Sequence, residues 1–494
     1  MTTTSSPAPI LVGGRWTPAR STATREIRSP ASGELVGVVP ECGIEDVDLA
    51  VRAARAAQLA WWRKPGVEKA VLLRQVGEAI RHMGKELATL MTRETGKPLI
   101  ESMDCIEWVA ACFEYYAEVG RASRGNSIPP VAPHQLNFTI KEPYGVVAAI
   151  VPFNFPLLLM AWKVAPALAA GNTVVAKPPH QNPLSNLMMA RAYELLPPGV
   201  VNVVTGDGPN AGEALLQHPG VDLVAFTGST EVGRHIAAEA GRQLKKVNLE
   251  LGGVDPFIVF ADADLEVAVR AVAWARLLNA GQVCTSSKRI YLVREIAEAF
   301  TARLVEYVRT LKVGDPLDGT TDVGPLITAD AVRKVEDQVR RALAQGARLL
   351  LGGQALPGPG HYYAPTILGG VLHGSLPTTE EIFGPVISLI VADDAEAAIR
   401  MANDSNYGLG AVVYTRSLEL ALHAMDGIKA GTFWVNDPLT DNDAGPFGGA
   451  RWSGVGRELG EEGLDAFREA KHVHIDYVQE VKPFWFPNAG REVK

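Results

Sequence analysis

The stretch from Tyr144 to Gly253 alternates short apolar runs with segments of helical periodicity, and this alternation constrains the fold most strongly. Helical segments separate five apolar runs: Val146–Val151, Thr173–Lys177, Val201–Val204, Leu223–Thr227 and Lys246–Leu249. Short apolar strands joined by crossover helices predict a parallel sheet that is covered on both faces. Ligands of such sheets bind at the carboxyl ends of the strands, so the polar residues that follow these runs are candidates for a site.

Other regions of the chain have different patterns. Ile44 to Gly120 has helical periodicity throughout, and Asn137 to Lys141 alternates like an edge strand in an arm that leaves the body. A second strand and helix alternation runs from Pro256 to about Trp434 and predicts a second α/β domain. The tail from His472 to Lys494 is too aromatic to remain in water, so we expect it to pack on a neighbour.

Composition and charge exclude several functional classes. The 494 residues suggest roughly three domains, or two large ones. Hydrophobic residues make up 47% and charged residues 21%, which is typical of a globular chain and not of a disordered one. The 47 Lys and Arg residues against 55 Asp and Glu give a net charge of −8 without a long basic run. We therefore expect a small-molecule ligand and neither nucleic acid nor a membrane surface as a partner.

The compartment and the redox chemistry follow from the N-terminus and the cysteines. Met1 to Leu11 has no Lys or Arg before its short apolar piece, so we expect no secretory signal and a cytoplasmic location. The uncharged stretch Gly145–Trp162 contains Pro152, Asn154 and Pro156, which argue against a membrane span. Only four cysteines occur, without a CxxC pair or a nearby His, so no metal site is predicted.

Two side chains are candidates for catalysis. Cys284 lies in Asn279-Ala-Gly-Gln-Val-Cys284-Thr, whose small residues allow close approach of a ligand and leave the thiol accessible. An inert thiol is the alternative for this segment taken alone. Glu250 ends a predicted strand beside Gly252 and Gly253, which puts a carboxylate at the edge of the sheet where ligands bind. The alternative for Glu250 is a solvated strand end.

Loops after two other strands are candidates for anion binding. The Asn154 amide precedes a helix and could donate to a developing oxyanion, although an N-cap explains it equally well. Phe226 to Gly233 forms a strand, a glycine turn and a helix, a geometry that holds phosphate on backbone N–H groups. Gly206 to Gly212 approaches the GxGxxG spacing, but Pro209 favours a plain turn there.

Seven segments in one order make the pattern specific. They are Pro152-Phe-Asn-Phe-Pro156, Lys177-Pro178, Phe226-Thr-Gly-Ser-Thr-Glu-Val-Gly233, Glu250-Leu-Gly-Gly253, Gly281-Gln-Val-Cys284, Glu380-Glu-Ile-Phe-Gly-Pro385, and Pro446-Phe-Gly-Gly449 with Ser453-Gly-Val-Gly-Arg-Glu458. With these segments the whole chain resembles the aldehyde dehydrogenase superfamily, in its hydrolytic, non-acylating, NAD(P)-dependent type.

The resemblance implies an α/β fold in three parts. Residues 1–120 and 144–252 would form a Rossmann-like parallel-sheet cofactor domain, and residues 253–452 a second α/β catalytic domain. Residues 121–143 and 468–494 would form a small β oligomerisation arm and tail. A homodimer or homotetramer is therefore expected.

The resemblance also implies the catalytic roles. Cys284 would attack the aldehyde carbonyl, while the Asn154 amide and the Cys284 backbone N–H hold the oxyanion. After hydride loss the thioester would be hydrolysed with Glu250 as the general base. Members that transfer the acyl group to coenzyme A commonly lack this base, so Glu250 favours hydrolysis. Glu458 matches a glutamate sometimes assigned to proton relay, and a surface salt bridge is the alternative for it.

For the cofactor, the resemblance implies that Lys177 reaches the adenosine ribose. It implies further that Gly228 to Gly233 line the pyrophosphate and that Glu381 and Phe383 position the nicotinamide ribose and ring. The remaining positions that match the cofactor site are Val151, Pro152, Phe153, His180, Gly208, Gly212, Phe226, Ser229, Val232, Leu251 and Gly252.

The chain departs from the family pattern at His180. NAD-preferring members often have a glutamate at this place, three residues after the lysine, where it binds the ribose hydroxyls. Without that carboxylate a 2′-phosphate is not repelled, and a protonated imidazole beside Lys177 would attract one. A simple turn of the chain is the alternative role for His180. We therefore expect NAD as the cofactor and regard NADP as admissible. A second departure, Arg451 in place of the usual lysine, keeps the positive charge.

The resemblance places Phe155, Leu159, Trp162 and Phe447 around the aldehyde. This apolar and aromatic wall suits aliphatic, aromatic or quaternary-ammonium aldehydes. Asp441 and Asp443 precede Pro446, and their charge would disfavour a carboxylated aldehyde if they face the mouth of the tunnel.

Two other functions compete with this interpretation. A thiol esterase or hydrolase would use Cys284 without redox chemistry, but it leaves the cofactor-loop matches unexplained. A catalytically silent nucleotide-binding protein would keep the fold without turnover, and the presence of Cys284, Glu250 and Asn154 together argues against it.

Overall fold

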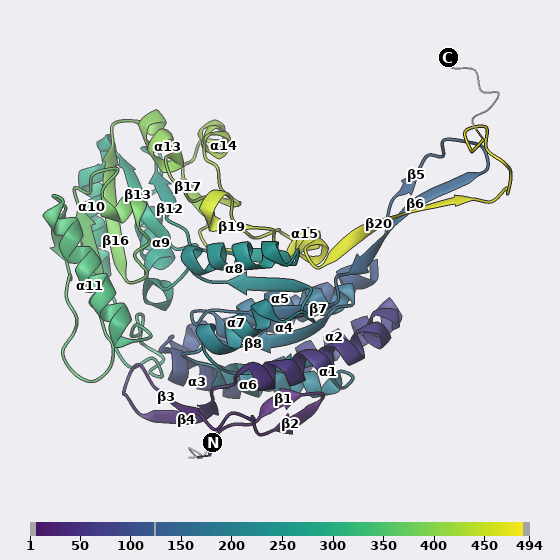
Figure 1. Ribbon diagram of the computed structural model, residues 1–494. Coiled ribbons are helices and arrows are strands. Elements are labelled where there is room, and N and C mark those ends of the chain that lie inside the picture. Colours follow the sequence, from purple (N-terminus) through teal and green to yellow (C-terminus); the bar gives the residue numbers. More distant parts are fainter. Residues whose placement is uncertain (1–5, 123–124, 488–494) are drawn as a thin grey trace.

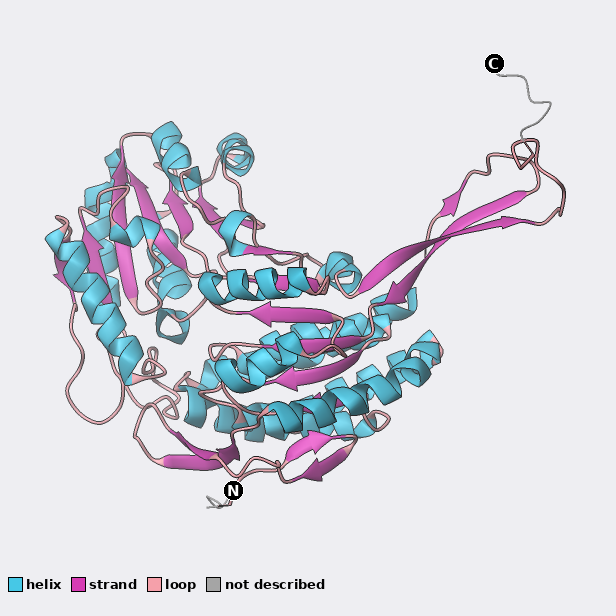
Figure 2. Ribbon diagram, in the orientation of Figure 1, coloured by secondary structure: helices cyan, strands magenta, loops and turns pink. Residues whose placement is uncertain are grey.

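The computed structural model describes residues 6–122 and 125–487. Residues 1–5, 123–124 and 488–494, which fall in the predicted cofactor domain, arm and tail, lie outside the described residues. The described chain forms two large α/β units, each built around one sheet, and an arm that projects from the first unit (Figures 1 and 2). We call these units the first layer and the second layer. The expectation of an α/β fold with two parallel sheets is confirmed.

The first sheet has the strand order β19-β11-β10-β7-β8-β9-β1-β2. Its parallel centre consists of β7 (Val146–Ile150), β8 (Thr173–Lys177), β9 (Val201–Val203), β10 (Leu223–Thr227) and β11 (Lys246–Glu250). The antiparallel additions at its edges are β1 (Ile10–Val12), β2 (Arg15–Thr17) and β19 (Gly454–Val455). Strands β7, β8 and β9 follow one another toward one edge of the sheet. The chain then crosses back, and β10 pairs with the other side of β7. Ligands bind at such a reversal of strand order.

Helices cover both faces of this sheet. They are α1 (Ile44–Arg63), α2 (Gly66–His82), α3 (Gly84–Thr95), α4 (Leu99–Ala122), α5 (Pro156–Ala170), α6 (Leu184–Met189), η1 (Ala190–Leu195), α7 (Glu213–Gln217) and α8 (Thr230–Arg242). All five residues of β7 are buried, and α5 is buried along nearly its whole length because it packs between the sheet and α4. Sheet and helices therefore enclose one apolar core on each face.

The second sheet has the order β14-β15-β16-β13-β12-β17-β18. Its strands are β12 (Asp255–Val259), β13 (Ser287–Val293), β14 (Arg348–Leu351), β15 (Thr366–Gly369), β16 (Val386–Ala392), β17 (Gly410–Tyr414) and β18 (Thr432–Val435). Its helical elements are α9 (Leu265–Leu277), η3 (Leu278–Gly281), α10 (Arg294–Arg309), α11 (Ala329–Ala344), α12 (Leu376–Thr379), α13 (Ala395–Asn403) and α14 (Leu418–Gly427). All neighbouring strands are parallel except β14 and β15, so the predicted second α/β layer is present.

The arm is a separate small sheet of three strands. β6 (Gln135–Pro143) pairs antiparallel with β20 (Arg468–Asp476) over nine residues, and β5 (Ser127–Ile128) pairs with β6. η4 (Arg451–Ser453) and α15 (Gly460–Asp465) precede β20. The arm extends away from the body in Figure 1. The domain boundaries inferred from the sequence remain predictions.

Two features differ from the expectations. The N-terminal region contains strands, since β3 (Thr24–Arg28) and β4 (Leu35–Pro40) form a two-stranded sheet and β1 and β2 extend the first sheet. The expected plain turn before α7 is a π-helical turn, η2 (Gly208–Gly212), in which the Asp207 side chain accepts a hydrogen bond from the Asn210 N–H. Across residues 6–122 and 125–487 no helix has the length and apolar character required to cross a bilayer.

Candidate active site

Three predicted site residues meet at the carboxyl edge of the first sheet. Asn154 follows β7, and Gly228 follows β10, while Glu250 is the last residue of β11. The register pairs Thr227 with Glu250, and the Gly228 N–H donates to the Glu250 carbonyl at 3.1 Å. Because β10 lies between β7 and β11, segments that are far apart in the sequence reach one edge of the sheet.

The second sheet brings Cys284 to the same place. Cys284 lies in the loop between η3 and β13, and Glu381 lies in the loop before β16. These two loops are in close contact. Gly281 has φ +74°, and a side chain there would collide with the Gly384 carbonyl, so the contact requires glycine. The Phe383 ring meets the Phe153 ring of the first sheet edge with centroids 5.9 Å apart. The site therefore lies where the two layers meet.

Hydrogen bonds hold the loop that carries the thiol. The Asn279 side chain donates to the Asn154 carbonyl and to the Gln282 carbonyl, each at 3.2 Å. The Asn279 N–H donates to Glu101 Oε2 of α4 at 3.0 Å. Asn279 and Ala280 have φ values of 50° and 54°, an unfavourable conformation for residues with a Cβ, so the surrounding contacts must maintain it.

Cys284 and Glu250 are close enough to influence each other's ionisation. Burial raises the pKa of Cys284 well above its usual value, and the Glu250 carboxylate raises it further, while Lys288 lowers it. Burial and the neighbouring Glu458 raise the pKa of Glu250 well above its usual range, against the opposing effects of Lys163 and Cys284. Neither Glu250 carboxylate oxygen has a hydrogen-bond partner within the described chain. A buried carboxylate of this kind is a strong base that can accept a proton.

Glu458 belongs to a buried ion pair. Lys163 of α5 contacts Glu458 Oε1, and it also donates to Thr227 Oγ1 at 2.5 Å. Both charged side chains are buried, so the surface salt bridge considered for Glu458 is wrong. The Lys163 charge lies next to Glu250 and opposes the rise of its pKa. This pair therefore tunes the candidate base.

The edge that faces the second layer offers groups that a dinucleotide needs. A Cβ on Gly252 would lie 2.5 Å from Glu381 Oε2, so a larger residue there would displace the Glu381 carboxylate. Ser229 caps α8 by accepting from the Val232 N–H at 3.3 Å, and the first N–H groups of a helix lack internal acceptors. Lys177 is buried at the end of β8. A glycine beside Glu381, a helix N-terminus and a buried lysine together fit NAD or NADP.

The remaining predicted cofactor residues occupy the same edge, with different exposures. Val151 and Phe226 are buried, whereas Val232 is 45% exposed. Gly233 packs against the Leu251 side chain, which leaves no room for a larger residue. Gly208 and Gly212 bound the η2 turn, and a Cβ on Gly212 would lie 3.7 Å from Lys177 Cε. Pro152 follows Val151 directly after β7.

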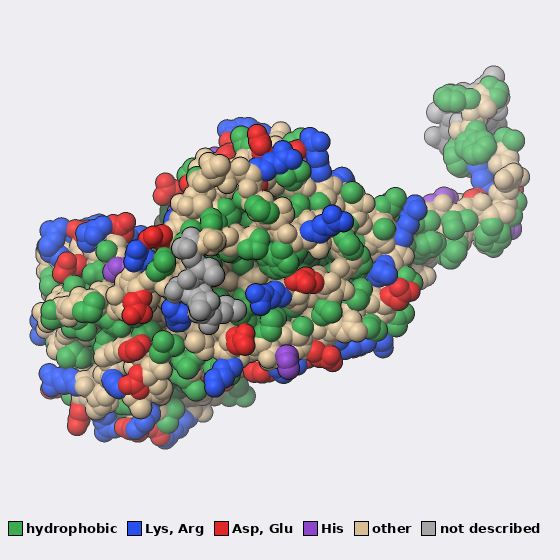
Figure 3. All heavy atoms as spheres, turned by 90° about the horizontal axis from the view of Figure 1, so that it is seen from below, with side chains coloured by type: hydrophobic (Ala, Val, Ile, Leu, Met, Phe, Trp, Pro, Cys, Tyr) green, Lys and Arg blue, Asp and Glu red, His purple; other side chains and the backbone are tan. Residues whose placement is uncertain are grey.

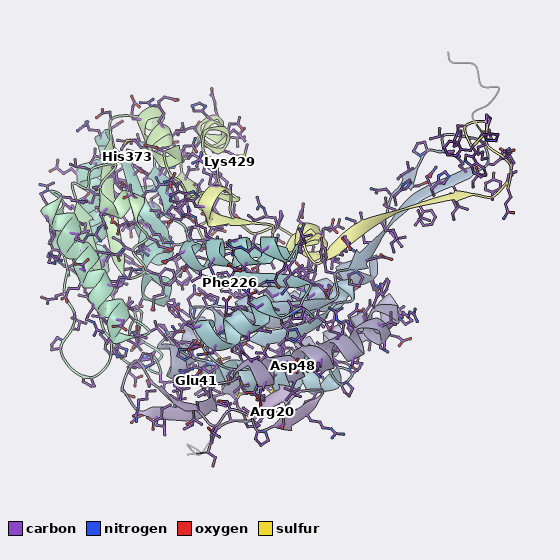
Figure 4. The ribbon with its side chains drawn as sticks, in the orientation of Figure 1. Arg20, Glu41, Asp48, Phe226, His373 and Lys429 are labelled. Atoms are coloured by element: carbon purple, nitrogen blue, oxygen red, sulfur yellow. The ribbon has the colours of Figure 1, made fainter. Side chains whose placement is uncertain are left out.

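Lys177 and His180 are surrounded by charged residues of the N-terminal strands. Arg25 Nε lies 2.5 Å from Glu41 Oε1, and His180 Nε2 lies 3.0 Å from the same oxygen. Burial and the Arg25 charge lower the pKa of His180, and burial lowers the pKa of Lys177 to about 8. The His180 ring thus has a carboxylate neighbour, Glu41, which Figure 4 labels in the same part of the molecule as Asp48 and Arg20.

A cavity of about 550 Å³ extends from Cys284. The four residues predicted to contact the aldehyde, Phe155, Leu159, Trp162 and Phe447, all line it. Trp162 and Phe447 pack with their ring centroids 4.9 Å apart. Asp441 and Asp443 line the same cavity. Residues from α4, α5 and α9 complete the wall.

Several residues of this region were not predicted from the sequence. Lys288 Nζ donates to the carbonyls of Val283 and Cys284 and lies 3.1 Å from Glu381 Oε1. Its position four residues after Cys284 was the only signal in the sequence. Glu41 and Arg25 gave no signal, because their strands were not predicted.

Known proteins are similar to this chain over most of its length. Residues 16–473 match the aldehyde dehydrogenase family. The mitochondrial aldehyde dehydrogenase of Mesocricetus auratus is 40% identical over 477 residues, which cover 95% of this chain and 95% of that one. The succinate-semialdehyde dehydrogenase (NADP(+)) GabD of Escherichia coli (strain K12) is 38% identical over 467 residues, covering 94% and 97%. A crystal structure of a betaine aldehyde dehydrogenase variant of Staphylococcus aureus with NAD+ has a TM-score of 0.95 at 33% identity, covering 97% and 99%. The chain belongs to the aldehyde dehydrogenase family.

Proposed function

We propose that Cys284, Glu250 and Asn154 carry out the NAD(P)-dependent oxidation of an aldehyde to a carboxylic acid, the activity of the family to which the chain belongs. The observation that carries this assignment is the meeting of the thiol of the second layer with the carboxylate of the first sheet edge, where the Asn154 backbone carbonyl also accepts a hydrogen bond from Asn279 of the thiol loop. The cavity that opens from the thiol supplies the space for an aldehyde.

In the first half of the reaction the Cys284 sulfur forms a bond to the carbonyl carbon. Glu250 takes the thiol proton, because its buried carboxylate has a raised pKa. The Asn154 amide and the Cys284 N–H donate to the oxyanion of the thiohemiacetal. When bound, NAD or NADP accepts the hydride that leaves this carbon. The oxyanion then reforms a C=O bond as a thioester.

In the second half a water molecule cleaves the thioester. Glu250 first passes the proton that it took from the thiol to solvent. It then accepts a proton from this water while the new C–O bond forms and the Cys284 thiolate leaves, and the thiolate takes this proton back from Glu250. The Lys163 and Glu458 pair lies beside Glu250 and sets how readily it holds the proton. The carboxylic acid is released and the thiol is restored.

The residues proposed to hold the cofactor fall into three groups along its length. Lys177, His180 and the η2 turn serve the adenosine end, and Ser229 with the α8 N-terminus serves the pyrophosphate. Glu381 serves the nicotinamide end, where Gly252 leaves space beside it. We propose that residues 1–120 and 144–252 form the cofactor domain. Residues 253–452 form the catalytic domain, from which Glu381 reaches the cofactor site.

We further propose a homodimer or homotetramer in the cytoplasm, with residues 121–143 and 468–494 as the oligomerisation arm and tail. Large apolar side chains on the arm are exposed, among them Val131 at 95% and Phe486 at 86%, and hydrophobic atoms cover much of the arm in Figure 3. Such a surface is typical of a protein interface. All four cysteines are free, which suits a reducing compartment.

The test is the growth of reduced-nicotinamide absorbance when an aldehyde is mixed with NAD or NADP. Cys284→Ala should abolish the signal. Glu250→Gln should slow turnover about 10²–10⁴-fold, the usual contribution of a general base. Turnover of an ester at an undiminished rate without cofactor, together with no aldehyde-dependent signal, would favour a thiol hydrolase instead.

A further inference from the structure

Carboxyl groups outnumber cations around the cavity that opens from Cys284. Five acidic side chains line it: Glu101, Asp104, Asp437, Asp441 and Asp443. Arg270 is the one cationic residue that lines it in the described part of the chain. Arg270 Nη2 already lies 2.8 Å from Glu266 Oε1, so this guanidinium is balanced by its own partner. The cavity therefore has a negative surplus.

None of the five carboxyl groups forms an ion pair in the described part of the chain, and Lys97 acts on Glu101 only from a greater distance. Over residues 6–122 and 125–487, none of the five acidic side chains has a Lys, Arg or His nitrogen within 4.0 Å. Glu101 is only 8% exposed, and one of its oxygens accepts the Asn279 N–H. Carboxyl groups that are taken out of water without a counter-ion cost free energy, which a cationic ligand would recover.

The ionisation of the inner carboxyl groups is sensitive to such a ligand. Burial raises the pKa of Glu101 to about 7, with Lys97 acting in the opposite direction. Burial and the neighbouring Asp443 raise the pKa of Asp441 to about 7. A cation bound between these groups would stabilise their charged forms and lower both pKa values again.

Aromatic rings surround the same space. Trp162 and Phe447 form a packed pair in the wall, and Trp108 and Trp274 line the cavity with 41% and 51% of their surface exposed. Indole and phenyl faces attract ammonium groups, and Trp does so most strongly. Carboxylates and aromatic faces around one cavity are the two recognition elements of organic cations.

We propose that this cavity selects aldehydes that carry an ammonium group, an inference that rests on the proposed oxidation at Cys284. Cys284 and the five carboxyl groups line one cavity, so a single aldehyde can place its carbonyl at the sulfur and its ammonium group among the carboxyl groups. The ammonium group binds the carboxyl and aromatic lining while the carbonyl reaches the sulfur.

An anionic aldehyde is disfavoured by the same charges. Lys97 is a buried cation behind the cavity wall, and its Nζ lies 3.3 Å from the centroid of the Phe155 ring. Phe155 lines the cavity and Lys97 does not. The Phe155 ring therefore lies between the Lys97 ammonium group and the cavity. A carboxylated aldehyde would meet carboxylates in the cavity and no accessible cation.

Three matched aldehydes test the proposal: 4-(trimethylammonio)butanal, its uncharged carbon isostere 5,5-dimethylhexanal, and the anionic 5-oxopentanoate. The first two have the same shape and differ only in charge. We expect kcat/KM for the cation to exceed that for the isostere by about tenfold or more, since one additional contact between opposite charges contributes a factor of this order. The anion should be the poorest substrate.

Variants locate the preference in the cavity. Asp441→Asn should reduce the ratio of kcat/KM for the cation to kcat/KM for the isostere several-fold, through a higher KM for the cation. Asp426→Asn, on the exposed face of α14 outside the cavity, should leave the ratio as it is. Butyltrimethylammonium, which has no carbonyl, should compete with 5,5-dimethylhexanal in the unmodified protein and compete less well in Asp441→Asn.

The outcomes separate this inference from the proposed function. If the isostere is oxidised but the cation is no better, or if 5-oxopentanoate is preferred, the inference is wrong and the oxidation stands. If none of the three yields reduced cofactor although the protein is folded and binds NAD, the proposed function itself is wrong, and the inference fails with it.

Discussion

Lys288 Nζ lies 3.1 Å from Glu381 Oε1 and at the same time donates a hydrogen bond to the carbonyl oxygen of Cys284. One buried ammonium group thus joins the loop of the nucleophile to the loop proposed to hold the nicotinamide ribose. Glu381 in turn lies 3.4 Å from the Gly253 N–H of the first layer. Lys288 is therefore a positioning residue for both halves of the site.

Replacing Lys288 with Met should loosen both loops while keeping the length of the side chain. Glu381 loses its ion-pair partner, so we expect the KM for NAD to rise about tenfold, equivalent to about 1.4 kcal/mol. The loss of the charge that lowers the Cys284 pKa should also slow alkylation of the thiol at pH 8. Lys288→Arg keeps the charge and is the control. An unchanged KM together with an unchanged alkylation rate would show that Lys288 has no positioning role.

The reactivity of the free thiol should depend on pH in one direction. Burial and Glu250 hold the Cys284 pKa well above its ordinary value of about 8.5, so the thiolate fraction grows as pH rises and should not level off below about pH 9. Iodoacetamide alkylation from pH 6 to 10, corrected with Cys284→Ser, measures this. A plateau near pH 7 would contradict the expectation.

The buried pair of Lys163 and Glu458 should be important for stability. Lys163→Met leaves the Glu458 carboxylate buried without its partner, which typically costs about 3–5 kcal/mol. The double variant Lys163→Met with Glu458→Leu removes both charges and should regain most of that loss. Urea denaturation followed by circular dichroism compares the variants. Equal stability of the single variant and the unmodified protein would mean that the pair contributes nothing.

Glu41 should influence the choice between NAD and NADP. Its carboxylate contacts both Arg25 and His180, so a 2′-phosphate near His180 would meet a negative charge as well as two basic groups. Glu41→Gln should therefore improve NADP relative to NAD by about tenfold in Kd, because the repulsion is removed. Fluorescence titration with both cofactors measures the ratio. Glu45→Gln, exposed on α1, is a matched control. An unchanged ratio would place the 2′-position away from Glu41.

The parts of the fold with strong periodicity were predictable. The helix Ala329–Ala344 lies within the alternation predicted from Pro256 to about Trp434, and all five parallel strands of the first sheet were predicted to within one residue. Buried parallel strands are continuous apolar runs, so their sequence signal is strong. The edge where their carboxyl ends meet could therefore be anticipated.

The unpredicted parts depend on contacts between distant segments. β1 and β2 have only three residues each, and β19 has two, so they contain no repeat that a period could reveal. Glu41 and Lys288 acquire their partners only through tertiary structure. The burial of Glu458 likewise depends on α5 lying beneath it, which no local pattern expresses.

The pairing of β19 with β11 has a mechanical consequence. The chain leaves the first sheet directly after Glu250 and returns beside it, where Gly454 pairs with Glu250 and Leu251 donates to the Ser453 carbonyl at 2.9 Å. The chain therefore passes between the two layers at adjacent strands, and Glu250 lies at this junction, whereas Cys284 and Glu381 belong to the layer beyond it. The separation of the nucleophile from the base is thus fixed by how the two layers are packed on each other and not by either sheet alone.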